Sequence, residues 1–423
     1  MTLLNDNSIV CSDLTDHPII KQLLNKDIST LRSENFIVFP TQTSESKDLE
    51  NDNYIFQLSN GKIWTRNIVG LLSYNNDVIQ IQSRFMEKSN EDFFLRYMMQ
   101  KVLNFNVVSS SLNSDNMQSY YDLLMYVFPY FLNEAMKKGV YKEYVEKSYN
   151  DANIKGRIDV ASQIKYNSPF TGKVAYTTRE FSYDNKITQL IRHTIEKIQK
   201  EKSHILTQND VTRENIRTIK EMTHSFSYQC REAVVRNNLL NPIKHGYYEE
   251  YSSLQRLCLQ ILKDNKTGYG NDEMQVQGVI IDVAWLWEEY IHKITNWNHY
   301  GRKSHLGTLK LFKQLFEETQ QHRYPDFEVN GVPIDTKYKR RLDKRNDYNQ
   351  ITTYVHILES SQGGFLQPTD EYDSKSFVRL GTLYGGGDIF TYKFYVPQEQ
   401  DSYESFVEEI KVSEYSLIET FIE

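Results

Sequence analysis

The stretch YPDFEVNGVPIDTKYK (Tyr324–Lys339) has the pattern of a short β-hairpin. Its centre, Asn330-Gly331, is the dipeptide most typical of a two-residue type I′ turn, because both central positions of that turn need a positive φ. Counting outward from the turn places Asp326 directly opposite Asp335. The sequence therefore predicts a hairpin that holds two carboxylates at the same level.

The two faces of this hairpin differ in character. Side chains alternate between faces along a strand. One face therefore carries Lys337 together with the two aspartates, and the other is apolar and should pack on a core. The apolar face consists of Phe327, Val329, Val332 and Ile334.

Two opposed carboxylates need a physical reason, because like charges at a distance of roughly 5 Å destabilise a sheet. A divalent cation between Asp326 and Asp335 would be such a reason. Mg²⁺ is commonly held by one or two carboxylates together with phosphate oxygens. Lys337 would then lie where it can donate to a phosphate oxygen or to an attacking water. The alternative, aspartates that splay into water on a surface hairpin, is equally compatible with the turn alone.

Two flanking segments have the apolar spacing of amphipathic helices. WLWEEYIHKI (Trp285–Ile294) carries Glu288, and DYNQITTYVHIL (Asp347–Leu358) carries Gln350 and Tyr354 four residues apart, on one helix face. Either segment alone is an ordinary amphipathic helix with a solvated face. Their order around the hairpin makes a combined site the better interpretation.

The ordered set resembles the PD-(D/E)xK nuclease superfamily, which places its metal-binding Asp and its Asp/Glu-x-Lys on neighbouring strands. The match is Pro325-Asp326 followed by Asp335-Thr336-Lys337. The resemblance implies a metal-dependent DNA endonuclease with a mixed central sheet. It implies catalytic roles for Asp326, Asp335, Lys337 and Glu288, metal binding by Asp326, Asp335 and Glu288, and DNA contact or site shaping by Gln350 and Tyr354.

Charge along the chain is uneven. The net charge is −7, whereas KYKRRLDKR (Lys337–Arg345) is strongly basic. A charge run is most often a solvated face. Because this one follows the Asp-x-Lys directly, it is also predicted to hold the DNA backbone. The residues expected to do so are Lys339, Arg340, Arg341, Lys344 and Arg345.

A narrower resemblance, to the McrC family of nuclease subunits of McrBC-type restriction systems, covers most of the chain. It is carried by RNIVGLLSYNNDVIQIQSRF, by the segment 139–167 with its KGRID run, by WLWEEYI and by PIDTKYK. It implies Mg²⁺ as cofactor, with Mn²⁺ as a substitute, and double-stranded DNA as substrate. It also implies a GTP-hydrolysing AAA+ partner of the McrB type, which McrC stimulates. The chain has no G-x-x-x-x-G-K-[ST] motif, so no nucleotide is expected on this chain itself.

The expected fold is mixed α+β in three successive parts. Residues 1–110 read as a β-rich, partner-binding domain with hairpins in 54–85, 111–270 as a mainly helical region, and 271–423 as the nuclease domain. Helices are expected in 91–103, 117–147, 187–201, 211–222 and 252–264, with a return to strand at 154–164 and a strand-end turn at 381–388. The polar run 41–53 reads as a loop, and 265–272 as a domain boundary.

Composition excludes several classes of protein. Three dispersed cysteines, Cys11, Cys230 and Cys258, form neither a disulfide framework nor a zinc motif. The chain shows no signal peptide and no apolar stretch of about 20 residues, so a cytoplasmic protein without membrane contact is expected. Two other functions stay open: an adaptor of an AAA+ ring with a vestigial site, and a free-standing restriction endonuclease. Dimerisation through the nuclease domain is also left open.

Overall fold

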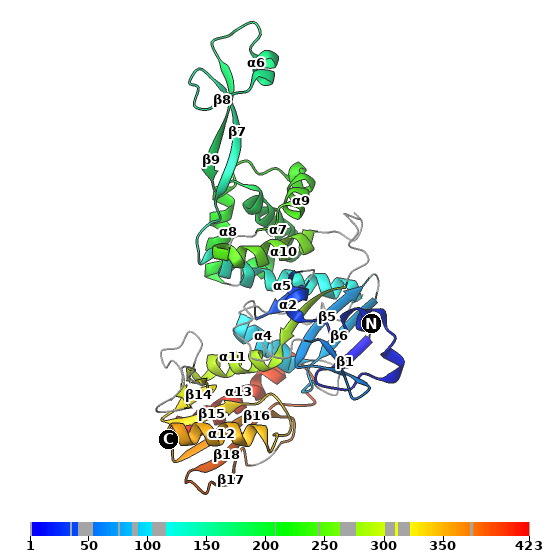
Figure 1. The fold of residues 1–423 in the computed structure, drawn as a ribbon, viewed down its shortest axis with the longest axis vertical. Helices are drawn as coiled ribbons and strands as arrows, with labels where there is room; N and C mark the ends of the chain where they lie inside the picture. Colours follow the sequence, from blue (N-terminus) through cyan, green and yellow to red (C-terminus); the bar gives the residue numbers. More distant parts are fainter. Residues whose placement is uncertain are drawn as a thin grey trace, which may run out of the picture. The chain divides into compact units, whose positions relative to one another are not determined.

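The chain folds into two compact units (Figure 1). Unit 1 joins residues 1–120 with 271–423, and unit 2 is 121–270. The first and third of the predicted parts thus share one unit. The computed structural model describes residues 2–33, 36–40, 54–74, 77–86, 92–103, 116–207, 209–243, 246–262, 276–300, 309–311, 322–372 and 375–422.

The first sheet of unit 1 has the order β1-β6-β5-β10-β2. β10 follows unit 2 in the sequence. It joins this sheet antiparallel to β5 and parallel to β2. Gly70 permits this close approach, because a Cβ there would lie 2.0 Å from the Val279 carbonyl oxygen. The strands are β1 (Thr2–Asn5), β2 (Phe36–Phe39), β5 (Ile68–Tyr74), β6 (Asp77–Gln82) and β10 (Gln277–Asp282).

Short elements cover this sheet and extend its core. The helices α1 (Pro18–Leu23) and α2 (Ile28–Ser33) bury Ile19, Ile20 and Leu31 in it. Beside them lies the hairpin of β3 (Phe56–Ser59) and β4 (Lys62–Thr65), whose Asn-Gly turn has positive φ at both residues. The hairpins predicted in 54–85 are therefore confirmed.

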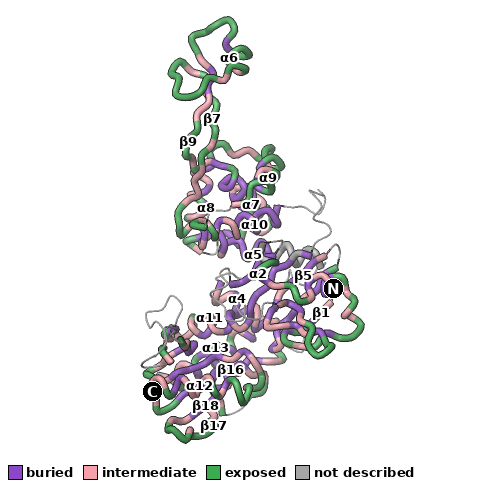
Figure 2. Tube along the Cα trace, viewed as in Figure 1, coloured by how far each residue is buried: buried purple, intermediate pink, exposed green. Residues whose placement is uncertain are grey.

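The second sheet of unit 1 has the order β11-β14-β15-β16-β18-β17, and β15, β16 and β18 run parallel. β16 and β18 are continuous buried runs, as expected for parallel strands covered on both faces (Figure 2). Helix α12 (Asn346–Ile357) packs Ile351 and Val355 against Phe365 of β16. The strands are β11 (Asn298–His299), β14 (Phe327–Val329), β15 (Val332–Thr336), β16 (Gln362–Thr369), β17 (Phe377–Thr382) and β18 (Asp388–Tyr395); β12 (Leu309–Lys310) and β13 (His322–Arg323) pair separately.

The acidic end of the chain is a packed helix. Helix α13 (Tyr403–Ile422) contacts α4 (Phe93–Leu103), which in turn packs on α11 (Val283–Thr295). The Tyr97 and Tyr290 hydroxyls donate to Glu414 Oε1 at 3.0 and 2.8 Å. Glu414 is therefore buried and accepts two hydrogen bonds, whereas Glu404, Glu408, Glu409 and Glu419 of the same helix are exposed.

Unit 2 combines helices with one long hairpin. Helix α7 begins with a capping box at Asn185 and buries Leu190, Ile191 and Ile195. The helices are α5 (Asn116–Met136), α7 (Lys186–Lys202), α8 (Asp210–Met222), α9 (Arg231–Leu240) and α10 (Glu249–Leu262), with short 3₁₀ turns at Ser203–Leu206, Tyr228–Cys230 and Gly246–Tyr248; unit 1 has another at Ser12–Leu14.

The hairpin of unit 2 extends away from these helices (Figure 1). Strand β7 (Glu143–Asp151) pairs along its whole length with β9 (Val174–Ser182), and β8 (Arg157–Ile158) and α6 (Val160–Tyr166) complete its end. No residue of β7 is buried. The helix predicted through 139–147 was therefore wrong: Tyr141, Tyr144 and Val145 have helical spacing, but pairing with β9 makes this segment a strand.

The first part of the helix predicted over 117–147 is confirmed by α5, and the other helix predictions are confirmed by α4, α7, α8, α10, α11 and α12. The predicted return to strand at 154–164 is confirmed only for β8. The turn at 381–388 connects β17 and β18 as predicted. The predicted loop 41–53 and the predicted boundary 265–272 lie outside the described residues. Within the described residues, no helix combines the length and apolar character needed to cross a membrane.

Candidate functional site

The hairpin of β14 and β15 forms as the sequence predicts. Asn330 and Gly331 have φ values of 52° and 79°, which a type I′ turn requires. The register pairs Phe327 with Ile334, and both side chains are fully buried. The apolar face therefore anchors the hairpin in the core and fixes the positions of the aspartates at its open end.

Asp326 and Asp335 differ in their contacts. Asp326 lies one residue before β14, and its Oδ2 accepts hydrogen bonds from the Thr336 backbone N–H at 2.7 Å and from the Thr336 hydroxyl at 2.8 Å. Asp335 is fully buried, and its Oδ2 lies 2.6 Å from Lys337 Nζ. A charged neighbour and local donors thus offset the repulsion that was expected between the two carboxylates.

Lys337 is held on both sides. Its ammonium pairs with Asp335 and donates to Gln350 Oε1 at 3.0 Å. Burial by itself would favour the neutral amine, but the carboxylates of Asp335 and Asp326 more than compensate, and the pKa of Lys337 is raised above its usual value. Lys337 is therefore a fixed positive charge beside the carboxylates at neutral pH.

Helix α12 ties the two ends of the hairpin together. Gln350, which binds Lys337, also donates from Nε2 to the Tyr354 hydroxyl at 2.8 Å. The Tyr354 hydroxyl donates in turn to the Tyr324 carbonyl oxygen at 2.9 Å, just before Asp326. The predicted shared face of Gln350 and Tyr354 is confirmed, and it connects Lys337 to the segment that carries Asp326.

A cavity of about 790 Å³ opens at this site. Among the predicted site residues, Glu288, Asp326, Lys337, Lys339 and Gln350 line it. Asp335 lies behind this lining and Tyr354 is buried beside it. The structure thus brings most of the predicted catalytic set to one cavity.

Glu288 reaches the cavity because of how helix α11 begins. Asp282 caps that helix by accepting from the backbone N–H groups of Ala284 and Trp285 at 2.9 and 3.2 Å. The cap fixes the first turns, and Glu288 follows in the second, where its Oε1 lies 3.4 Å from His299 Nδ1. The start of the helix therefore places Glu288 in the lining of the same cavity as Asp326.

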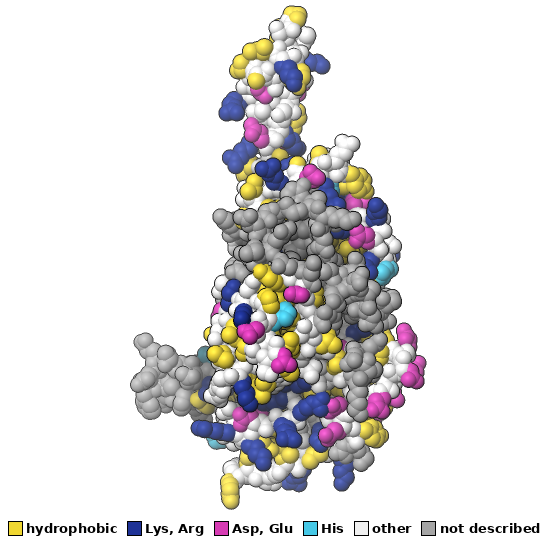
Figure 3. All heavy atoms as spheres, turned by 90° about the vertical axis from the view of Figure 1, so that its right-hand side faces the viewer, with side chains coloured by type: hydrophobic (Ala, Val, Ile, Leu, Met, Phe, Trp, Pro, Cys, Tyr) yellow, Lys and Arg dark blue, Asp and Glu magenta, His cyan; other side chains and the backbone are white. Residues whose placement is uncertain are grey.

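The predicted DNA-contacting basic residues divide into two groups. Lys339 pairs with Asp347 at 2.5 Å and lines the cavity, whereas Arg340 pairs with Asp370 at 2.6 Å and is exposed. The remaining three, Arg341, Lys344 and Arg345, are exposed and do not line the cavity. Lys and Arg side chains gather on one face of unit 1 at the level of α12 and β16 (Figure 3).

Carboxylate oxygens are the ligands that a hard cation such as Mg²⁺ prefers. Within the described part of the chain, no group of three or more His, Cys, Asp or Glu side chains is placed to hold a metal ion by itself. The three predicted ligands therefore do not make a closed protein cage. They fit Mg²⁺, which commonly takes one or two carboxylates and completes its shell with phosphate oxygens and water.

Several residues around the cavity were missed by sequence reasoning. Thr336, which binds Asp326, stands inside the Asp-x-Lys motif and could have been found there. Others come from the N-terminal sheet, and no local pattern connects them with the hairpin. These are Asn7, Arg66, Asn67 and Arg84.

One family model matches this chain, and two solved structures are similar to it. The family model described as "McrBC 5-methylcytosine restriction system component" matches residues 63–367, well over half of the chain. No curated protein matches the sequence. Two solved structures from Thermococcus gammatolerans are similar. A half-complex of McrB AAA+ hexamers with bound McrC has 14% identity, a TM-score of 0.48, and covers 98% of this chain and 99% of that chain. A cryo-EM structure of the McrBC complex has 14% identity, a TM-score of 0.30, and covers 69% and 86%.

Proposed function

The chain belongs to the McrBC family of restriction system components; from this premise we propose that unit 1 carries a Mg²⁺-dependent DNA endonuclease site of the PD-(D/E)xK type. The observation that carries the proposal is the gathering of Glu288, Asp326, Lys337 and Gln350 at one cavity, with Asp335 directly behind. A surface hairpin with splayed aspartates would not bury Asp335 or tie Lys337 to α12.

The proposed reaction is hydrolysis of a phosphodiester bond in double-stranded DNA. A Mg²⁺ bound at Asp326 and Asp335, with Glu288 as a further candidate carboxylate, would supply Lewis-acid chemistry for the phosphate and lower the pKa of water. Lys337, protonated and oriented by Gln350, donates to a phosphate oxygen and offsets the negative charge that develops there. Lys337 is paired with Asp335 and donates to Gln350, and its proposed role is that of an electrostatic stabiliser.

The exposed basic residues after β15 would hold the flanking DNA. These residues are exposed and come directly after the cavity-lining Lys339 in the sequence; they are Arg340, Arg341, Lys344 and Arg345. Contacts of this kind fix the position of the duplex without reading its sequence. Binding should therefore weaken steeply with salt.

We also propose that the chain acts together with a GTP-hydrolysing AAA+ protein of the McrB type. The family is defined as one component of a restriction system, and this sequence has no phosphate-binding loop of the G-x-x-x-x-G-K-[ST] kind. Nucleotide-driven DNA translocation would then be the task of the partner chain. The net charge of −7 is in keeping with a subunit that leaves general DNA holding to its partner.

The sequence alone suggested the N-terminal region as the partner-binding part. The end of the β7–β9 hairpin in unit 2 is a better-supported contact, because it exposes large apolar side chains (Figure 3). Val160, Ile164 and Phe170 are 64%, 67% and 69% exposed. Apolar side chains grouped on a projecting element are typical of protein interaction sites.

The experiment that tests this function is cleavage of duplex DNA by the purified chain in Mg²⁺, with and without the AAA+ protein and GTP. Cleavage only in the complete mixture, and its loss in Asp335→Ala, is the expected result. Cleavage by the chain alone would support a free-standing endonuclease. Complex formation with stimulated GTP hydrolysis but no cleavage would support an adaptor with a vestigial site.

A further inference from the structure

One wall of the cavity at the catalytic hairpin is formed by residues from the N-terminal part of the sequence. Asn7, Arg66, Asn67 and Arg84 line it, and all four belong to loops at the ends of the N-terminal strands. The sequence separates these residues from the hairpin by most of the chain. None of these four residues has a role in the proposed cleavage reaction.

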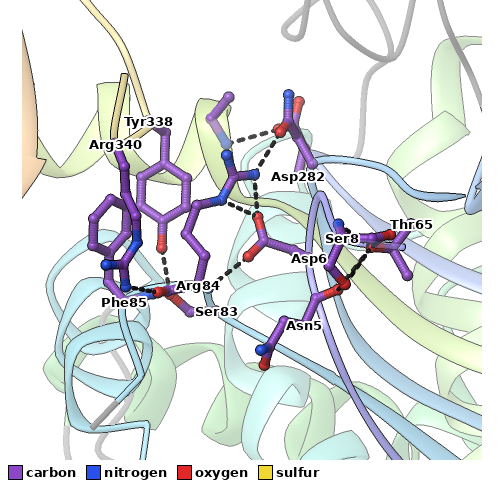
Figure 4. A network of polar contacts seen from close by, with 12 residues as sticks. Asn5, Asp6, Ser8, Thr65, Ser83, Arg84, Phe85, Asp282, Tyr338 and Arg340 are labelled. Atoms are coloured by element: carbon purple, nitrogen blue, oxygen red, sulfur yellow. Dashed lines mark hydrogen bonds and ion pairs between the residues drawn. The ribbon is translucent and has the colours of Figure 1, made fainter. Parts of the chain in front are cut away.

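The wall is fastened to the catalytic strand immediately after Lys337. The Tyr338 hydroxyl and Ser83 Oγ are 2.5 Å apart, and both side chains are buried (Figure 4). The Arg340 guanidinium donates to the Arg84 carbonyl oxygen at 2.6 Å. The Tyr338 ring also meets Phe85 edge-on, with 5.1 Å between the ring centroids. These contacts fix the N-terminal residues relative to Lys337.

The two arginines of the wall have different roles. Arg84 is committed to structure: its Nε donates to Asp6 Oδ2 at 2.8 Å, and the Asp6 side chain is fully buried. Its guanidinium also donates to Asn67 Oδ1 at 2.6 Å. Arg84 therefore holds the loops in place and contributes little net charge to the cavity.

Arg66, a half-buried residue, lines the same wall. Its backbone is fixed, because its N–H donates to the Ile55 carbonyl at 3.3 Å and its carbonyl accepts from Asn7 and Ile68 at 3.1 and 2.7 Å. A guanidinium presents planar donors that match phosphate oxygens and cannot be deprotonated at working pH.

We propose that Arg66 binds a backbone phosphate of the DNA in this cavity, so that the N-terminal sheet positions the substrate of the site on β15. The proposal rests on the proposed nuclease function, since it takes DNA as the occupant of the cavity. Arg66 is a positioning residue: it contacts a flanking phosphate and leaves the cleavage chemistry to Lys337 and the carboxylates.

The test is DNA binding by the full chain, with partner and a non-hydrolysable GTP analogue, measured by fluorescence anisotropy at several salt concentrations. Arg66→Gln should weaken binding about tenfold and reduce the slope of log K against log salt by about 1. Arg66→Lys, which keeps the charge, should retain most of that slope. Lys62→Gln is the matched control, because Lys62 is an exposed cation on β4 that does not line the cavity.

In cleavage assays, Arg66→Gln should raise KM about tenfold and change kcat by less than about threefold, because a flanking phosphate contact acts in both ground and transition states. Unchanged binding and salt slope in Arg66→Gln, or an equal loss in Lys62→Gln, would overturn the proposal. Failure of the nuclease function gives a different pattern. The wild type would then not cut DNA in any mixture, whereas the effect of Arg66→Gln on the salt slope would persist.

Discussion

Two β-hairpins of this protein differ in how far their side chains are buried. The β14–β15 hairpin has only three register pairs, but Phe327 and Ile334 on one of its faces are fully buried. The β7–β9 hairpin has nine register pairs, and β7 has no buried residue (Figure 2). The short hairpin is positioned by the core beneath it, whereas the long one depends on its own strand pairing.

Cross-strand pairs explain how the long hairpin holds although Ala175 and Tyr176 are the only buried residues of its two long strands, β7 and β9. Tyr149 and Tyr176 are direct partners and stack with 5.5 Å between ring centroids, and Tyr144 and Phe181 are 5.0 Å apart. Such pairs contribute roughly 0.2–1 kcal/mol each. The comparison teaches that burial fixes atoms for chemistry, while an exposed ladder presents a surface. The predictions below test that difference.

The largest effect is expected at the buried ion pair of β15. Asp335→Ala should lower cleavage by at least about a thousandfold and destabilise the chain by roughly 3 kcal/mol, because a buried ammonium loses its partner. Relief of the repulsion between the two carboxylates would act in the opposite direction and is the smaller effect. Thermal unfolding measures this, and Asp335→Ala with Lys337→Met should regain stability but not cleavage. A single variant as stable as the wild type would contradict the ion pair.

The two hairpins can be compared directly by removing one aromatic ring from each. Phe327→Ala should cost about 3–5 kcal/mol, because a fully buried ring leaves a cavity. Phe181→Ala should cost less than about 1 kcal/mol, since Phe181 is 55% exposed. Denaturant unfolding of both variants gives the two values. Similar losses in the two variants would remove the distinction between the hairpins.

A smaller effect is expected where α12 supports Lys337. Gln350→Ala should lower kcat about tenfold, because Lys337 loses the hydrogen bond that orients it. Stability should fall by about 1 kcal/mol, as for one hydrogen bond. Tyr354→Phe is the matched control. It removes the hydroxyl that accepts a hydrogen bond from Gln350, keeps the ring, and should have a weaker effect on kcat. Equal kcat losses in both would mean that α12 acts as a whole.

The end of the long hairpin should be nearly neutral for stability. Val160→Ser together with Ile164→Ser should change the free energy of unfolding by less than about 0.5 kcal/mol, because both side chains are largely exposed. Stimulation of GTP hydrolysis in the AAA+ partner should nevertheless fall. Lys165→Ser on the same helix is a control for the loss of a surface residue. Full stimulation by the double variant would exclude this contact.

The smallest difference is expected in the pH dependence. The pKa of Lys337 is raised, so this residue stays protonated at every pH below the usual lysine value of about 10.4. Its contribution to stability is therefore present throughout pH 6–9 and is lost only as the pH rises through the higher folded value. Lys337→Arg should cleave with a pH profile of the same shape. A basic limb near pH 8 that the variant lacks would identify Lys337 as a titrating base.

The candidate site was predictable where its signals were local. The Asn330-Gly331 turn fixed the register of its strands, and the four-residue spacing put Gln350 and Tyr354 on one face of α12. Prediction failed at β7, where the spacing of Tyr141, Tyr144 and Val145 imitates a helix and the partner strand lies a long way along the chain. It also missed α13, whose acidic composition concealed the buried positions Phe406, Ile410 and Leu417.

The sequence by itself determined the turn, the strand register and the helix faces, because these depend on φ preferences and on contacts between near neighbours. Only the tertiary structure placed β10 among the N-terminal strands, brought Arg66 to the cavity and paired Asp335 with Lys337 in a buried setting. The first two arrangements join residues far apart in the chain, and the burial of the ion pair depends on the core packed around β15. Their positions follow from packing the whole core, which no local pattern encodes.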